Sequence, residues 1–292
     1  MLDTEIAERA RTPLVDRVPA PSFFLVSAVF HYLGPSFAVL LFVHVDVLGV
    51  AWLRIASAAV VFAVWRRPWR VLLQATPNQR WVLLGLGAVL AAMNSLFYLA
   101  IDRLPLSTVG AIEFLGTIVL AAVGVRTPRN IAALALAVVG VFVLTDVRIA
   151  GEPLGFAFAF ANCAGFMLYV ILGHRIANSG DDEISGIDRL GAAMLVAAVA
   201  ATPFAVGAAA PAFTHPVWLL WAIGVGLCSS VIPYVTDQLA MARLARATFA
   251  LMLALLPATA TVIGLIVLSQ VPTWRDLAGV GLVIAGVALH RT

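Results

Sequence analysis

Charge is scarce in this sequence of 292 residues, and lysine is absent altogether. Charged residues make up 11% of the chain, whereas soluble domains contain roughly a quarter. Cysteine is nearly absent as well, because Cys163 and Cys228 are the only two, and both lie in apolar segments without a CxxC spacing. This scarcity argues against a disulfide framework, and we expect both thiols to be small core residues.

Motifs that carry enzymatic chemistry are missing too. The sequence has no GxxxxGK(S/T) loop for ATP and no HExxH or GxSxG motif. No basic cluster is interleaved with aromatic residues, so nucleic acid is not an expected partner. The five histidines are scattered along the chain: His31, His44, His174, His215 and His290. We therefore expect neither an enzyme nor an ATP-driven pump, and no cofactor or metal.

Apolar residues are abundant instead. They make up 62% of the chain, and the mean hydropathy is +1.03, which is far more apolar surface than a soluble domain needs. The apolar runs are about 20 residues long, the length of a membrane-spanning helix. They do not alternate with polar residues, which excludes an outer-membrane barrel. The composition therefore predicts an all-α polytopic membrane protein.

Ten apolar segments can be placed along the chain. They run approximately over 21–42, 48–65, 81–101, 105–124, 129–146, 153–174, 187–208, 217–238, 247–269 and 275–291. The loops between them are short, and the longest are 66–80 and the acidic 175–186. Because the loops are short, we expect successive helices to be neighbours in space.

The arginines predict the orientation of these segments. One set of loops carries fourteen arginines, the other set carries three, and Arg54 lies inside the second segment. The side richer in arginine is the cytosolic side under the positive-inside rule. Both termini are therefore predicted to be cytosolic, with residues 1–20 as a tail that lacks the layout of a signal peptide.

The two halves of the chain resemble each other at an offset of 140 residues. AIDRLPLSTVGA at 100–111 aligns with AMARLARATFAL at 240–251 at this offset, and LAVVGV at 136–141 is similar to LVIAGV at 282–287, nearer the end of each half. Residues 21–150 and 151–292 would then be two five-helix repeats. Because five is odd, the second repeat would be inverted relative to the first, as in many secondary transporters, whose substrate site lies between the repeats near the bilayer midplane.

The most specific stretch of the chain is MNSLFYLAIDRLPLSTVGAIEFLGT, residues 93–117. It resembles a motif of the drug/metabolite transporter superfamily, the ten-helix EamA-type exporters, and within it the bacterial threonine/homoserine and aromatic amino-acid exporters. The matching positions are Asn94, Phe97, Tyr98, Ile101, Pro105, Leu106, Glu113, Phe114 and Gly116. The chain departs from the pattern of the threonine type at three places: Thr117 replaces proline, Asp237 replaces glutamate and Leu256 replaces glutamate before Pro257.

The resemblance implies a transporter of the bacterial cytoplasmic membrane that exports amino acids or related small metabolites by alternating access. Such a protein would meet a small-molecule substrate and the lipid bilayer, as a monomer or a homodimer. The resemblance does not identify the substrate or the coupling ion. A carrier of another metabolite or drug, in either direction, and a structural membrane protein therefore stay open as alternatives.

Glu113 is the first candidate for the substrate site. A carboxylate at membrane depth costs about 2.5–3.5 kcal/mol to insert, and such residues are often functional. Glu113 would either contact a substrate amine and take up a proton, or be a structural acid paired with a buried donor such as Arg54. Arg54 and Arg189 open equivalent helices, and we expect them to snorkel or to pair with acids such as Asp46 and Asp188.

The other candidates are polar and aromatic residues that share helix faces. Pro35 and Pro257 lie within apolar segments, where proline removes a backbone hydrogen bond, and are predicted hinges. His31 belongs to the residue type that titrates near physiological pH, although a lone intramembrane histidine is as often a satisfied hydrogen-bonding residue. The predicted cavity lining consists of Glu113 with Asn94, Phe97, Tyr98, His31, Tyr32, Asn162, Phe166, Tyr169, Tyr234, Asp237 and Gln238.

Overall fold

The computed structural model describes residues 18–124, 127–145, 152–178, 185–244, 249 and 255–289. Helices are the only regular elements in these residues. Most of the predicted N-terminal tail, the middle of the acidic loop 175–186 and the side chains of Phe114 and Thr117 lie outside the described residues.

A described helix overlaps each of the ten predicted apolar segments. The long elements are α3 (Ala20–Leu41), α4 (Val47–Arg66), α6 (Pro77–Ile101), α7 (Leu106–Gly124), α8 (Pro128–Thr145), α9 (Pro153–Ala177), α10 (Gly186–Ala205), α12 (Pro216–Gly226), α13 (Ile232–Met241), α15 (Leu255–Leu268) and α16 (Trp274–Leu289). Short elements are α5 (Trp69–Gln74), α11 (Ala210–Phe213), the 3₁₀ turn η1 (Gly207–Ala209) and the π-helical turn η2 (Leu227–Val231), which joins α12 to α13.

Six of the helices are long and apolar enough to cross a membrane: Pro21–Leu41, Val47–Arg66, Pro77–Ile101, Pro153–Ala177, Gly186–Ala205 and Pro216–Met241. Helices of this kind are stable in lipid because they satisfy their backbone hydrogen bonds internally. The structure therefore agrees with a multi-pass integral membrane protein.

Local signals explain where several helices begin. Proline occupies the first turn of α6, α9 and α12, where its missing N–H costs nothing. Thr76 and Gln79 form a capping box at the start of α6, and Ser185 and Asp188 form another at the start of α10. The capping box explains why α6 begins four residues before the predicted segment.

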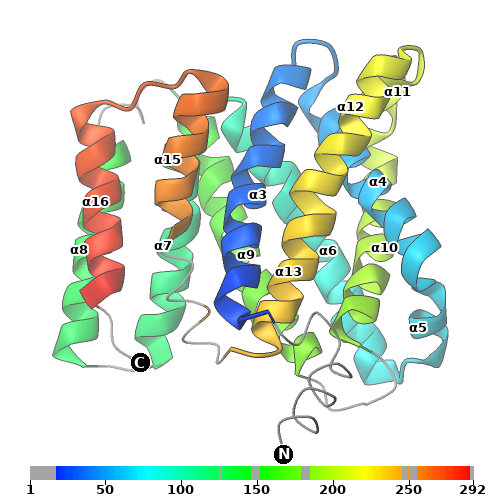
Figure 1. Ribbon diagram of the computed structural model, residues 1–292, viewed down its shortest axis with the longest axis horizontal. Helices are drawn as coiled ribbons and strands as arrows, with labels where there is room; N and C mark the ends of the chain where they lie inside the picture. Colours follow the sequence, from blue (N-terminus) through cyan, green and yellow to red (C-terminus); the bar gives the residue numbers. More distant parts are fainter. Residues whose placement is uncertain are drawn as a thin grey trace, which may run out of the picture.

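Helices α3 and α9 occupy the centre of the bundle (Figure 1). Helix α3 packs against α12, η2, α13 and α15, whereas α9 packs against α6, α7 and α13. Helices α8 and α16 pack against each other at one edge of the molecule, and α4, α5 and α10 lie toward the opposite edge (Figure 1). Helix α3 begins and α16 ends at the same end of the bundle (Figure 1).

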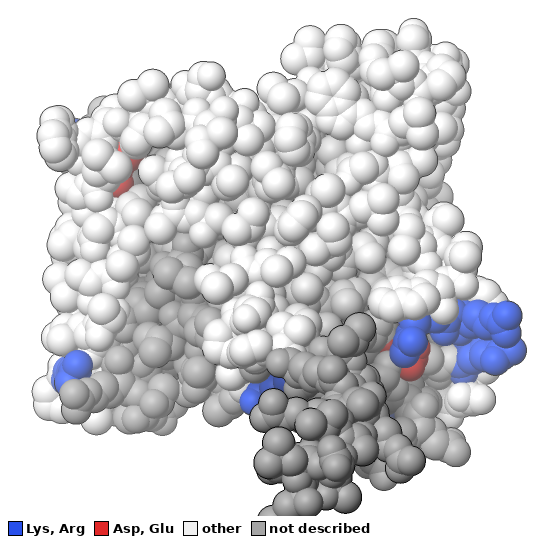
Figure 2. Space-filling view, in the orientation of Figure 1, with Lys and Arg blue, Asp and Glu red and all other residues white. Residues whose placement is uncertain are grey.

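Basic side chains gather at that same end. Figure 2 shows the arginines on this face of the molecule at the end where α5 lies, while most of the remaining surface carries no charge. Arg67, Arg70 and Arg80 are exposed there, next to the exposed Trp69 and Trp81. Arginine and tryptophan together are typical of a membrane–water interface. The end that carries α5 is thus the one that the arginine pattern predicts to be cytosolic.

Candidate functional site

Two buried carboxylates lie between the central helices. Glu113 comes from α7 and is 2% exposed, and Asp237 comes from α13 and is 3% exposed. Each acid accepts one hydrogen bond from a side chain of α3 and one from a side chain of α9. This arrangement defines the candidate site, which we call the two-acid site.

Glu113 is held by neutral donors. The Tyr32 hydroxyl donates to its Oε2 at 3.1 Å, and the Asn162 amide donates to its Oε1 at 3.0 Å. His31 Nε2 lies 3.4 Å from Oε2, at ion-pair distance if the ring is protonated. Glu113 thus pairs with buried donors, but the named example Arg54 is not among these three side chains.

Asp237 has an equivalent environment. The Ser27 hydroxyl donates to its Oδ1 at 2.5 Å, and the Tyr169 hydroxyl donates to its Oδ2 at 3.0 Å. Ser27 and His31 are four residues apart in α3, and Asn162 and Tyr169 are seven apart in α9, so each helix presents one face to both acids. The sequence analysis missed Ser27, although its position four residues before His31 places it on that face.

Aromatic rings connect the two acids. The His31 ring contacts Tyr32, Phe97 and Phe166, with centroids 5.1, 6.4 and 5.7 Å away. From Phe166 the contacts continue to Tyr169 at 5.8 Å and from there to Tyr234 at 5.2 Å. The site therefore combines two carboxylates with a wall of rings, which suits a small molecule that is cationic on one side and apolar on another.

The remaining polar candidates lie around this centre. The Tyr234 hydroxyl donates to Asn94 Oδ1 at 2.9 Å, and the Asn94 amide donates back to Leu90 O at 2.6 Å. Gln238 points away from the acids, because its amide nitrogen lies 4.0 Å from Met241 Sδ. Tyr98 faces Arg54 instead of either acid, with the guanidinium carbon 5.1 Å from the ring centroid. The structure thus brings most of the predicted residues together, but places Tyr98 and Gln238 beside the two-acid site.

The two predicted hinges have different surroundings. Helix α3 continues without interruption through Pro35. The Ser36 hydroxyl of the next residue donates to Tyr32 O at 2.8 Å. Pro257 is the third residue of α15 as described, and its own carbonyl accepts from the Thr261 hydroxyl at 2.8 Å. Neither observation tests hinge motion, which stays a prediction.

The hydrogen-bond partners of the buried Arg54 were not predicted from the sequence. Its Nε donates to Ser230 Oγ at 2.8 Å and its Nη2 donates to Ser229 O at 2.7 Å. Asp46 does not pair with it, because Asp46 caps α4 by accepting from Leu48 N.

The other predicted pairings differ as well. Asp188 pairs with Arg66 at 2.6 Å, so it serves neither Arg54 nor Arg189. Arg189 donates to the carbonyl of Ile176 at 3.1 Å. Asp188 thus meets an arginine 122 residues away in the chain, whereas Arg189 meets a carbonyl of the preceding helix.

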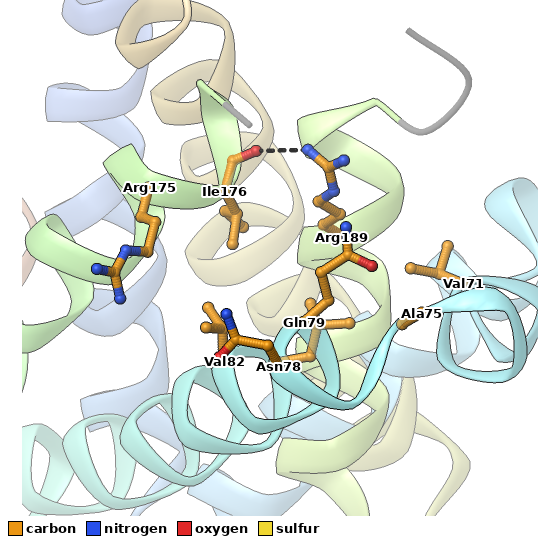
Figure 3. A pocket seen from close by; sticks show the side chains of 9 residues that line it. Val71, Ala75, Asn78, Gln79, Val82, Arg175, Ile176 and Arg189 are labelled. Atoms are coloured by element: carbon orange, nitrogen blue, oxygen red, sulfur yellow. Dashed lines mark hydrogen bonds between the residues drawn. The ribbon is translucent and has the colours of Figure 1, made fainter. Parts of the chain in front are cut away.

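The cavities of the described structure lie away from the acids. One, of about 150 Å³, opens at the α5 end, where Arg175 of α9 and Arg189 of α10 lie near Gln79 of α6 (Figure 3). A second, of about 450 Å³, is almost wholly apolar and lies between α4, α6 and α10. Glu113 and Asp237 line neither of these two cavities, and both side chains are buried. Among the described residues, no three His, Cys, Asp or Glu side chains are placed to hold one metal ion.

Removing one donor from Glu113 tests this geometry. We expect Tyr32→Phe to lower substrate exchange about 10-fold, because a hydrogen bond to a charged group contributes about 1.5–3 kcal/mol and the ring itself is retained. The measurement is the initial exchange rate of purified protein in liposomes. Ser95→Ala is the control, because that hydroxyl donates to Ala91 O of its own helix, and an equal loss in both variants would contradict the assignment.

Comparison with known proteins adds an independent observation. Residues 153–292 match the model of the EamA-like transporter family. Over 258 residues the chain is 31% identical to the threonine/homoserine exporter RhtA of Escherichia coli (strain K12), covering 86% of this chain and 84% of that protein. The threonine/homoserine exporter RhtA of Salmonella typhimurium (strain LT2) matches to the same extent. A solved crystal structure that is 19% identical shares the fold, with a TM-score of 0.57 over 92% of this chain and 96% of that one.

Proposed function

This chain belongs to the EamA-like family of the drug/metabolite transporter superfamily, and we propose that it exports small amino acids across the bacterial cytoplasmic membrane. The proposal joins two facts. The relatives named above are threonine/homoserine exporters, and the centre of this bundle carries two buried carboxylates beside a wall of aromatic rings. The second fact carries the proposal, because it concerns residues of this chain.

The energetics of the two acids favour a transport role over a purely structural one. Burying a carboxylate in a low-dielectric interior costs several kcal/mol, even after relaxation. Here Tyr, Ser and Asn donors offset part of that cost without neutralising the charge. A carboxylate solvated in this way can accept a proton or a substrate ammonium group, and lose it again when the surroundings change.

The packing of the helices supports a ten-span plan with two inverted halves, residues 21–150 and 151–292. Helix α9 packs against α6 and α7 as α3 packs against α13 and α15. Helix α10 contacts α6 as α4 contacts α12, while α4–α10, α7–α15 and α8–α16 each pair a helix with its repeat mate. Exchanging the two halves leaves these pairings unchanged. This symmetry is what an inverted repeat requires.

Alternating access would use that symmetry. The two-acid site lies where the halves meet, and both halves contribute to it, since Glu113 comes from the first and Asp237 from the second. Rocking one half against the other would open the buried site first to one side and then to the other. Pro35, Pro257 and the π-helical turn η2 are the proposed flexible points, because proline lacks a backbone N–H and a π-helical turn departs from the regular hydrogen-bond pattern of an α-helix. A proton on Glu113, His31 or Asp237 is the proposed coupling ion.

Counterflow in proteoliposomes tests the function. Purified protein is reconstituted in vesicles loaded with unlabelled threonine, and uptake of labelled threonine, homoserine, phenylalanine and serine is followed. We expect rapid exchange of at least one of these amino acids, abolished when the vesicles contain no protein.

The controls separate the alternatives. A panel of sugars, a nucleoside and a cationic drug is tested in the same vesicles. If well-folded protein exchanges one of those compounds but exchanges no amino acid, the proposed substrate class is wrong. A protein that exchanges nothing in either panel would instead favour a structural membrane protein.

A further inference from the structure

Arg54 is a charged residue in the core of the bundle, and it has no charged partner among the described residues. It lies in α4 and is 3% exposed. Ion pairs among the described residues include His31–Glu113, Arg66–Asp188 and Arg103–Asp102, and Arg54 belongs to none of these three. Its contacts in the described chain are a hydroxyl, a carbonyl and the face of Tyr98. A buried arginine normally pairs with an anion, because an uncompensated charge in the interior is costly.

Arg54 lies near the two-acid site. The rings of Tyr98 and Phe97 are in contact, with centroids 6.2 Å apart. Tyr98, over which the guanidinium lies, is the immediate neighbour of Phe97, and the Phe97 ring contacts His31 and Tyr32. The cation is therefore on the same aromatic wall as the two acids.

The guanidinium also has donors left for a ligand. Its hydrogen bonds within the described chain use Nε and Nη2, which leaves the N–H groups of Nη1. A guanidinium presents parallel N–H groups whose spacing matches the two oxygens of a carboxylate.

From this arrangement we infer that Arg54 binds the carboxylate of the substrate while the two-acid site binds its ammonium group. The inference rests on the proposed function and narrows it: the preferred substrate is a zwitterion with a free α-carboxylate. Two acids alone would favour simple amines, because nothing in such a site would require an anionic group. The Arg54 cation next to these aromatic rings supplies that requirement and completes the charge pattern of an amino acid.

Arg54 also has a structural task, which the experiment must separate from binding. Pro233 has no N–H, so it cannot donate to the carbonyl four residues before it, which is Ser229 O. Arg54 Nη2 donates to that carbonyl and thereby connects α4 to the turn η2. A purely structural arginine would affect all substrates alike, whereas a carboxylate-binding arginine would affect only substrates that carry a carboxylate.

The test compares threonine with threoninamide, which has the same shape and ammonium group but no carboxylate. Labelled-threonine counterflow is measured in proteoliposomes, with each compound also used unlabelled as competitor. We expect the wild type to prefer threonine about 10- to 100-fold, the factor that a charge-assisted hydrogen bond supplies. In Arg54→Gln we expect the preference to fall to about 1, and in Arg54→Lys to an intermediate value. A preference is a ratio, so a smaller folded fraction does not change it.

Ser230→Ala is the matched control, because it removes a hydrogen bond of Arg54 and keeps the guanidinium. It should retain the preference for threonine. If Arg54→Gln and Ser230→Ala both keep the preference while losing rate, Arg54 is structural and the inference is wrong, although amino-acid export stands. If neither compound competes for the wild-type protein, and the wild type exchanges no amino acid in the counterflow panel, the proposed function is wrong. The inference is then wrong as well.

Discussion

Glu113→Gln is expected to abolish amino-acid exchange, with a loss of at least about 100-fold, while the protein still folds. The substitution keeps the size of the side chain and its acceptor for Asn162, but removes the negative charge. Without that charge the site has nothing at this position to pair with an ammonium group or to carry a proton. Removing one partner of a buried charge pair costs about 3–5 kcal/mol, which is the basis of the expected loss.

Initial rates of counterflow measure this effect, with folding checked by size-exclusion chromatography in detergent. Glu152→Gln is the matched control, because Glu152 is exposed beside the start of α9, and it should leave exchange unchanged. Exchange by Glu113→Gln at more than half the wild-type rate would make Glu113 a structural acid. If Glu113→Gln still exchanges the substrate but no longer accumulates it in response to a pH gradient, Glu113 carries the proton and does not bind the substrate.

Gly34→Ala is expected to lower the stability of the protein by about 2–3 kcal/mol, the upper range for overpacking a core. Gly34 lies where α3 crosses η2, and an added Cβ would be 2.2 Å from Ser229 Oγ and 2.7 Å from Ser229 N. The hydroxyl can rotate away, but the backbone nitrogen cannot, so the two helices must separate. Because these residues lie between the Glu113 and Arg54 sites, exchange should fall together with stability.

Thermal unfolding in detergent measures the change, and we expect a midpoint lower by about 5–10 °C. Gly85→Ala serves as the control, because an added Cβ there meets nothing within 4 Å. Alanine is a better helix former than glycine by about 1 kcal/mol, so this control should be neutral or slightly stabilising. Equal midpoints for the two variants would show that the contact at Gly34 is not tight in the folded protein.

The sequence predicted the class of structure because the bilayer allows few alternatives. A run of apolar residues in lipid must form a helix to satisfy its own backbone, so composition and run length were enough to place the helices. Faces followed from periodicity, which put Asn162, Phe166 and Tyr169 on one face of α9. The motif around Asn94 and Glu113 indicated the family, and the relatives confirm it.

Periodicity alone could not tell which neighbours on a face belong to the site. Tyr98 follows Phe97 directly, so the two side chains point about 100° apart on the helix. Phe97 faces His31, whereas Tyr98 faces Arg54 and Phe42. The prediction treated both as one lining, because a sequence gives the angle between residues but not the rotation of the helix in its bundle.

Only the tertiary structure decided the partners of the buried charges. Asp237 and Ser27 are 210 residues apart in the chain, and Arg54 and Ser230 are 176 apart. Such pairs depend on how far each helix is shifted along its neighbour, and close contacts such as that of Gly34 with Ser229 fix this shift. The amino-acid sequence thus determined that helices form and which residues share a face. Packing between distant helices determined which charge meets which donor, because that choice depends on contacts between residues that no local pattern relates.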